Sequence, residues 1–265
     1  MRITVYASGS TGNCALASIG AARILVDDGV SLRRLKGFMA QDGLSPGDID
    51  AVFITHEHSD HISGLAMLTK YHGVRILANR PVASRLYGMI PEAGEYIEPV
   101  QPGASVEIKG VTLTPFPTSH DTPGSCGLRL DSDEGSMGFC TDLGVVTDEV
   151  KSALAGVDAA LIEANHDVDM LLSGAYPYPL KRRILSDTGH LCNEDAAATI
   201  VRLARRGMRD FILGHLSREN NTPELAAVTV RAALEEAGFG GEVRVTVAAR
   251  DHATGVSPRE CAAAL

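Results

Sequence analysis

Aromatic residues are scarce in this chain of 265 residues: tryptophan is absent, and aromatic residues account for 5% of the sequence. No apolar run approaches the ~20 residues that a membrane-spanning helix requires. The N-terminal residues 1–6 form a strand-like pattern and lack the charged and apolar regions of a signal peptide. From these absences we expect neither a membrane span nor a signal peptide, and no membrane partner.

Cysteine is also scarce, with five residues, an odd number, and no pair has C-x-x-C spacing. A disulfide framework normally has an even number of cysteines, and a structural zinc site needs closely spaced ones. The scattered cysteines favour a reducing compartment. The sequence therefore predicts a cytoplasmic protein without a disulfide framework or a structural zinc knuckle.

Positive charge is in deficit, because the formal net charge is −9. This balance argues against a general nucleic-acid-binding protein. One segment differs from the rest: residues 181–218 hold eight basic and four acidic residues, a net charge of +4. Such a segment is either a solvated helix face or a local anion-binding flank, and the sequence leaves both open.

The chain does contain many short apolar strands, followed by interspersed helices. No linker, repeat or low-complexity tract interrupts them, so we predict one domain over residues 1–265. Strands are expected at 2–6, 14–18, 23–26, 51–54, 75–78, 105–108, 111–115, 126–130, 136–140, 159–162, 210–213 and 243–247. This order predicts an α/β protein with sheet layers covered by helices on the outside.

Each expected helix is bounded by a capping residue or a terminal glycine. The expected helices are 62–72 before Gly73, 148–155 after Thr147, one from Asn193 to Gly207, and one from Thr222 to Gly238. Leu225, Val228 and Leu234 form one apolar stripe on the last helix, and we expect this stripe to face a sheet.

The densest group of potential metal ligands is the string His-Glu-His-Ser-Asp-His at 56–61, directly after an apolar strand. Residues i and i+2 of an extended chain point to the same side, so His56 and His58 can converge on one ion. Asp60 and His61 follow where a helix begins, and they would point toward a second ion. The string is not the zincin pattern H-E-x-x-H, because position 60 is aspartate. A strand-end site for two metals indicates a hydrolase.

Three further polar residues follow apolar strands beside turn residues: His120, Asp142 and His215. Each of them alone is a weak signal, but together they repeat one design, an apolar strand with a ligand at its tip. Rigid strand ends would hold two ions at a fixed spacing of about 3.5–4 Å.

The order H-x-H-x-D-H, a lone histidine, a lone aspartate and a late histidine resembles the metallo-β-lactamase superfamily over nearly the whole chain. The resemblance implies an αβ/βα four-layer sandwich with the site at one edge of the two packed sheets. It also implies a ligand set: His56, His58 and His120 for one ion, Asp60, His61 and His215 for a second, and Asp142 as the bridge. Asp60 is counted among the catalytic residues as well, and Asp27 is expected to orient a ligand rather than bind metal.

Four strings resemble the YycJ/WalJ branch of that superfamily: SGSTGNC at 8–14, EANHD at 163–167, GHLCNED at 189–195 and HLSRENN at 215–221. This resemblance implies 5′-to-3′ exonuclease activity on DNA. Asp28 and Ala164 depart from the branch pattern. Asp28 stands where a small residue is usual, and we expect it to add a negative charge near the metals.

The expected ligands are imidazole nitrogen and carboxylate oxygen without cysteine, which suits two Zn²⁺ or Mn²⁺ ions, with Fe²⁺ as a third choice. Two divalent ions, two carboxylates and a bridging hydroxide keep about one positive charge, which attracts an anionic phosphodiester. Because metals lower the pKa of bound water to about 7, this hydroxide is available at neutral pH. We therefore expect a two-metal phosphodiesterase whose substrate is DNA, with its oligomeric state left open.

The remaining candidates surround this ligand set. His190 and His166 are not needed as ligands, so each is either a general acid or a structural histidine. The glycine-rich loop that holds Ser10 and Asn13 is either a phosphate cradle or a tight turn between two strands. Further candidate substrate contacts are Asn165, Arg218 and Asn220.

Two other functions remain open on the sequence alone. The scaffold also suits a hydrolase of thioesters, lactones or small phosphodiesters; a secreted β-lactamase is disfavoured by the missing signal peptide. A non-enzymatic metal-binding regulator is the other alternative, and the intact ligand set argues against it.

Overall fold

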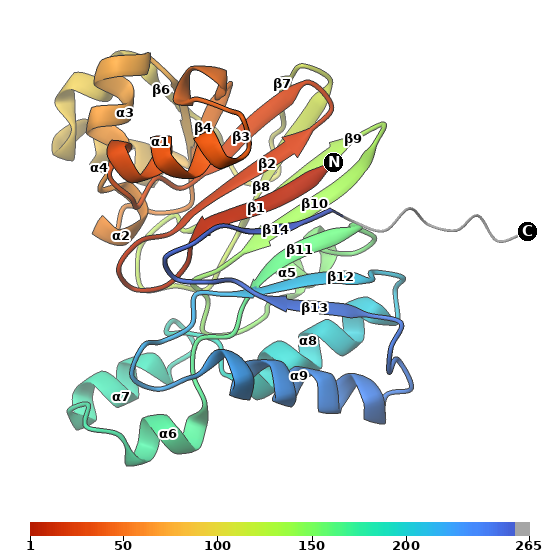
Figure 1. Cartoon of the computed structure of the whole chain (residues 1–265). Coiled ribbons are helices and arrows are strands. Elements are labelled where there is room, and N and C mark those ends of the chain that lie inside the picture. The colour runs from red at the N-terminus through yellow and green to blue at the C-terminus, as the bar shows by residue number, and fades with distance from the viewer. Residues whose placement is uncertain (258–265) are drawn as a thin grey trace, which may run out of the picture.

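The computed structural model of the protein describes residues 1–257; residues 258–265, the end of the predicted domain, lie outside the described part. Two seven-stranded sheets face each other, and helices cover their outer faces (Figure 1). This arrangement is the four-layer αβ/βα sandwich that the sequence predicted. In residues 1–257, every helix is too short or too polar to cross a membrane.

The first sheet is antiparallel on one side and parallel on the other. Its order is β14 (Thr254–Val256), β1 (Arg2–Ala7), β2 (Cys14–Ile19), β3 (Ala22–Val26), β4 (Ala51–Ile54), β5 (Arg75–Ala78) and β6 (Ile97–Pro99). Strands β3 to β6 run parallel, so their carboxyl ends share one edge. Its outer face packs against α1 (Leu32–Gln41), α3 (Leu65–His72) and α4 (Arg80–Met89). The short helix α2 (Ser59–Ile62) and two 3₁₀ turns (Pro46–Asp48 and Pro91–Tyr96) complete this half.

The second sheet has the same mixed character. Its order is β13 (Arg244–Val247), β12 (Asp210–Gly214), β11 (Ala159–Glu163), β10 (Gly135–Cys140), β9 (Cys126–Ser132), β8 (Val111–Pro117) and β7 (Val106–Ile108). Strands β10 to β13 run parallel. Its outer face packs against α5 (Asp148–Ala153), α8 (Asn193–Ala204) and α9 (Pro223–Glu236). Helices α6 (Val168–Ser173) and α7 (Tyr178–Ile184) lie beyond the sheet, at the same end as α2 (Figure 1).

Strand β4 shows how the layers hold together. Phe53 points between the sheets and shares a core cluster with Phe139 of β10, whereas Val52 and Ile54 pack toward the helices of the first sheet. Successive side chains of a strand point to opposite faces, so a strand buried on both faces is apolar throughout. The packing fixes the end of β4, and the histidine-rich string begins two residues later.

The structure differs from the predicted elements in several places. Strands β6 and β14 and helices α1, α4, α6 and α7 were not predicted from the sequence. The predicted helix 62–72 is broken between α2 and α3, where the amide of Gly64 donates to Asp28 O at 2.8 Å. A side chain at position 64 would place its Cβ 2.0 Å from Val30 O. This close approach to the neighbouring loop explains the break.

Two predicted helix details are wrong. Cys192, not Asn193, is the N-cap of α8. The side chain of Asn193 is fully buried and instead exchanges two hydrogen bonds with Asn221, at 3.1 and 2.9 Å. Val228 is 62% exposed, and Val230 occupies the buried stripe of α9 in its place. The predicted caps Thr147 and Thr222 are confirmed.

We expect Val230→Ala to lower the free energy of unfolding by about 2 kcal/mol, because it removes two buried methyl groups and leaves a cavity. Val228→Ala is the matched control on the same helix, and its effect should stay within about 0.5 kcal/mol. Urea unfolding of the metal-free protein measures both. Equal losses for the two variants would contradict the assignment of the buried face.

Candidate metal centre

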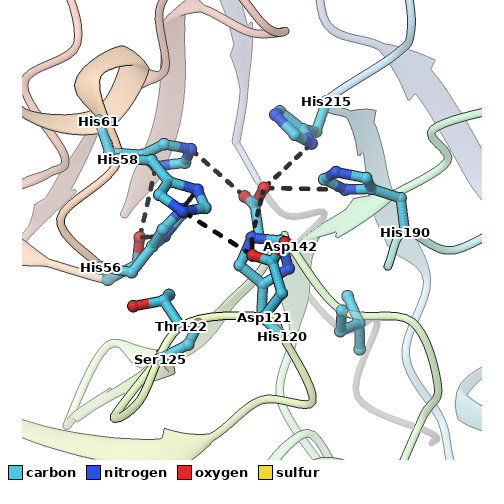
Figure 2. Close-up of polar contacts among 12 residues, drawn as sticks. His56, His58, His61, His120, Asp121, Thr122, Ser125, Asp142, His190 and His215 are labelled. Atoms are coloured by element: carbon cyan, nitrogen blue, oxygen red, sulfur yellow. Dashed lines mark hydrogen bonds and ion pairs between the residues drawn. The ribbon is translucent and has the colours of Figure 1, made fainter. Parts of the chain in front are cut away.

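Side chains able to bind metal gather at one end of the sandwich, where strands of both sheets finish (Figure 2). The structure brings together all seven predicted ligands: His56, His58, Asp60, His61, His120, Asp142 and His215. They follow strands β4, β8, β10 and β12 or lie in α2. Residues from both halves of the chain therefore face one small volume.

Three of the strand ends turn through a left-handed backbone conformation. The φ angles are 58° at Asp27, 60° at Asp142 and 55° at His215. Residues other than glycine adopt this region infrequently, although aspartate and histidine do so more readily than most. Such conformations cost about 1–3 kcal/mol each and cluster at functional sites. Here each turn lies one or two residues after a buried strand, beside the cluster of histidines.

His56, His58 and His120 form one cluster. His56 Nε2 lies 3.0 Å from His58 Nδ1, and the ring of His120 is centred 5.0 Å from that of His56. Burial, followed by repulsion from neighbouring histidines, holds the pKa of His56 well below its usual value. Burial also lowers the pKa of His120. Both rings therefore favour the neutral form that binds metal.

Asp60, His61 and His215 form a second cluster, and Asp142 lies between the two. Asp60 Oδ2 is 3.5 Å from His61 Nε2 and 3.8 Å from His215 Nε2. Asp142 Oδ2 is 3.4 Å from His61 Nε2, while its Oδ1 is 3.9 Å from His120 Nε2. Asp142 Oδ1 is also 3.4 Å from His215 Nδ1, so this carboxylate approaches histidines of both clusters, as a shared ligand would.

Buried carboxylates orient the histidines of the second cluster. Asp27 Oδ2 lies 2.7 Å from His61 Nδ1, and Glu163 Oε1 lies 2.7 Å from His215 Nδ1 and 2.9 Å from His190 Nδ1. Burial disfavours charge on His61, but Asp27 and Asp142 outweigh it and raise its pKa to about 9. Hydrogen bonds of this kind turn the opposite ring nitrogen toward a metal, and Asp27 lies where its predicted role requires.

Glu163 is the functional residue that sequence reasoning missed. Its carboxylate is fully buried at the end of β11, and it also accepts hydrogen bonds from the amides of Leu143 and Leu191, each at 3.1 Å. Burial opposes its charge, but His190 and His215 hold the pKa of Glu163 below its usual value. The sequence did contain a signal for Glu163, because this residue directly follows the predicted apolar strand 159–162.

The residues at this site fit divalent metal ions. His120 Nε2, His215 Nε2 and Asp142 Oδ2 are buried and make no hydrogen bond. Buried polar atoms are normally satisfied, so three such atoms at one site require another partner. Imidazole nitrogens and carboxylate oxygens together suit a divalent transition metal.

The family model of the beta-lactamase superfamily domain matches residues 22–216. The chain belongs to the metallo-β-lactamase superfamily. Its strand-end ligands thus stand on the scaffold that the sequence resemblance implied, and the sandwich of Figure 1 is the metallo-β-lactamase fold.

Relatives of this metallo-β-lactamase-fold protein cover nearly all of it. Exodeoxyribonuclease YycJ of Bacillus anthracis is 37% identical over 243 residues, 91% of each chain. Exodeoxyribonuclease WalJ of Streptococcus pneumoniae strain D39 is 36% identical over 260 residues, 96% of each chain. These matches confirm the resemblance to the YycJ/WalJ branch.

Solved structures agree on the fold. Zn²⁺-bound PqqB from Methylobacterium extorquens superposes with a TM-score of 0.72 at 17% identity, over 97% of this chain and 100% of that one. The short form of human tRNase Z gives a TM-score of 0.66 at 17% identity, over 98% of this chain and 100% of that one. At this identity the likeness shows the metallo-β-lactamase fold alone.

A cavity of about 260 Å³ opens beside the metal centre of this metallo-β-lactamase-fold protein. Four of the predicted residues line it: exposed Ser10, buried His120 and Asn165, and half-buried His190. Asn165 also donates to the backbone oxygen of His215 at 2.8 Å. The cavity therefore adjoins both the ligands and the better-placed candidate general acid.

Asn13 and Asn220 do not lie where direct substrate contact requires. Asn13 is buried, and its side chain bonds the amide and carbonyl of Gly9, which makes the glycine-rich loop a tight turn. Its amide nitrogen is also 3.1 Å from Asp60 Oδ2. Asn220 is 1% exposed and packs against Ser217. Burial therefore disfavours direct substrate contact by Asn13 and Asn220, and Arg218 is exposed but does not line the cavity.

His166 and Asp28 also differ from expectation. His166 is 1% exposed, neither of its ring nitrogens has a hydrogen bond, and burial lowers its pKa to about 4. Burial and the lowered pKa favour the structural alternative for His166 over the general acid. Asp28 is fully buried with both carboxylate oxygens unpaired, and burial together with Asp27 raises its pKa to about 8. The raised pKa favours the neutral form of Asp28, which opposes the expected extra negative charge near the metals.

We expect Asp28→Asn to stabilise the metal-free protein increasingly as the pH rises. The unfolded aspartate ionises near pH 3.8, whereas the folded one resists ionisation until about pH 8. The unfolded chain therefore binds fewer protons, and the wild type loses about 1.4 kcal/mol of stability per pH unit between these values. The asparagine variant lacks this loss.

Urea unfolding at pH 5, 6.5 and 8 measures the difference. The exposed Asp133→Asn variant is the control, because it removes a carboxylate that is not buried. If the free energies of unfolding of Asp28→Asn and wild type differed by the same amount at all three pH values, the raised pKa of Asp28 would be refuted.

Proposed function

We propose that this protein is a metal-dependent phosphodiester hydrolase that acts as a 5′-to-3′ exonuclease on DNA. The observation that carries the proposal is the placement of His190, held by Glu163, in the wall of the cavity beside the metal centre. The names of the YycJ and WalJ relatives, at 36–37% identity over most of the chain, support the choice of DNA. We further propose that the chain acts as a single domain in the cytoplasm.

The two clusters suit two ions, which we propose to be Zn²⁺ or Mn²⁺, with Fe²⁺ as the third choice. His56, His58 and His120 would hold one ion, Asp60, His61 and His215 the other, and Asp142 would contact both. When bound, such ions lower the pKa of water and neutralise charge that develops on a phosphate. Asp27 and Glu163 would keep His61 and His215 in the correct orientation.

His190 is the residue we assign to the leaving group. Its Nδ1 is engaged by Glu163, so Nε2 is the nitrogen available to the cavity. Hydrolysis between the first two nucleotides from a 5′ end breaks the bond from phosphorus to the 3′ oxygen of the first. Water supplies hydroxide to phosphorus, and His190 supplies the proton to the departing oxygen, to be restored from water. The products are a 5′-mononucleotide and a strand shortened by one nucleotide.

Only part of the basic segment 181–218 lies where it could attract an anionic substrate. Arg183 of α7 lines the cavity, whereas Arg205 and Arg206 follow the far end of α8. A helix rises 1.5 Å per residue, so the end of α8 is about 18 Å from its start near His190. The positive charge relevant to the reaction is therefore on α7.

Metal-loaded protein should release mononucleotides from a 5′-phosphorylated duplex, because the cavity and centre suit one terminal nucleotide. Protein stripped by a chelator should be inactive until Zn²⁺ or Mn²⁺ is restored. Product sizes on a gel from 5′- and 3′-labelled strands give the polarity. Asp142→Asn with reduced metal content is the matched loss-of-function control. Faster turnover of a thioester or of nitrocefin than of bis-p-nitrophenyl phosphate would reject the phosphodiesterase assignment.

His190→Ala should lower the rate on DNA by about 100- to 10,000-fold, the usual contribution of a general acid. The same variant should keep its metal and its rate on bis-p-nitrophenyl phosphate, because p-nitrophenolate leaves without a proton. His166→Ala is the comparison, and we expect it to retain the DNA rate if it folds. A matching loss on both substrates would show that His190 supports the metal centre instead.

A further inference from the structure

Helices α6 and α7 form an insert between β11 and α8, and this insert stands at the metal end of the sandwich (Figure 1). It exposes apolar and aromatic surface: Leu172 is 54% exposed and Tyr178 is 72% exposed. The chain is poor in aromatic residues, yet two of its six tyrosines, Tyr176 and Tyr178, lie within three positions of each other here. The fold of the sandwich does not require these side chains, since they lie outside its three core clusters.

The insert is held firmly to the metal centre. Lys181 Nζ donates to the carbonyls of Leu172 and Gly174, at 2.6 and 2.7 Å, and so joins the two helices. The amide of His190 donates to Ile184 O at 3.0 Å. At Gly189 a Cβ would lie 2.1 Å from the same carbonyl, so only glycine permits this approach. The position of the insert is thereby fixed relative to His190.

The space between the insert and the metal centre is the cavity of about 260 Å³. Tyr176, Leu180 and Ile184 of the insert line one side, and His120 and His190 line the other. Cavities for drug-sized ligands hold about 300–1,000 Å³, so this one suits a group the size of a single nucleotide. A double helix is far too large to enter it.

Positive charge lies at the rim of this cavity. The guanidinium of Arg183 pairs with Asp121, and Arg183 remains 59% exposed. Asp121 Oδ1 is in turn 3.4 Å from His120 Nε2 and 3.8 Å from His58 Nε2. The cavity wall thus holds an ion pair with a partly exposed guanidinium, next to the first ligand cluster. Sites for single-stranded nucleic acid combine basic side chains with an aromatic face on which a base stacks.

We propose that Tyr176 stacks on the base of the terminal nucleotide, with Arg183 beside its phosphate, so that the insert presents one nucleotide at a time to the centre. This inference rests on the proposed nuclease function and deepens it. The terminal nucleotide carries the leaving oxygen, and the cavity that would hold it is lined by His190. Tyr176 is then a positioning residue for the substrate, and its contribution depends on the presence of a base.

The test removes either the aromatic ring or the base. Substrates are a 5′-phosphorylated duplex with a normal terminal nucleotide, the same duplex with an abasic terminal nucleotide, and bis-p-nitrophenyl phosphate. Tyr176→Ala should lower kcat/KM on the normal duplex by about 10-fold or more, the usual effect of losing one stacked base. It should equal wild type on the abasic duplex and on bis-p-nitrophenyl phosphate. Tyr176→Phe should behave as wild type, and exposed Tyr71→Ala on α3 is the distant tyrosine control.

The stacking role would be overturned if Tyr176→Ala lost the same factor in kcat/KM on the normal and the abasic duplex. It would also be overturned if the variant lost no activity on either. A binding measurement, which needs no hydrolysis, distinguishes failure of the stacking role from failure of the nuclease function. Titration of metal-loaded wild type should favour deoxyadenosine 5′-monophosphate over deoxyribose 5-phosphate by about 10-fold, and Tyr176→Ala should abolish that preference. Wild type without a base preference rejects the proposal. Wild type with the preference but no DNA hydrolysis rejects the nuclease function instead.

Discussion

Glu163 ends strand β11 with a fully buried carboxylate, which two histidines at the metal centre contact through Nδ1. A buried charge is tolerated only when it is paired and hydrogen-bonded, and here His190, His215 and two backbone amides meet that need. One side chain therefore sets the orientation of a predicted ligand and of the predicted proton donor. The ligand cluster and the cavity share this anchor, so neither can shift independently of the other.

In the first sheet Asp27 has the same role as Glu163: its buried carboxylate follows β3 and orients His61. Each half of the sandwich thus contributes a buried carboxylate behind a histidine, and Asp142 lies between the two clusters. Parallel strands supply this symmetry, because their carboxyl ends meet at one edge. The left-handed turns at Asp27, Asp142 and His215 are compatible with a stable protein because the ends of the strands before them are buried.

Much of the fold was readable from local pattern. Twelve strands were predicted close to their observed places, because short apolar runs between turn residues have few alternatives. The missing strands β6 and β14 have only three residues each, too few to show an alternation. The break at Gly64 and the burial of Asn193 depend on contacts with segments distant in sequence. Local propensity contains no information about those contacts.

For the site, the sequence by itself singled out the candidate ligands, because histidine and aspartate at strand ends are chemically specific and their order resembles one superfamily. Tertiary structure decided the environment of each group. Burial neutralises Asp28 and encloses His166 and Asn220, whereas it leaves His190 and Tyr176 facing one cavity. Charge state and access depend on the local dielectric and on neighbours brought from elsewhere in the chain. Residue type and spacing cannot encode those properties directly.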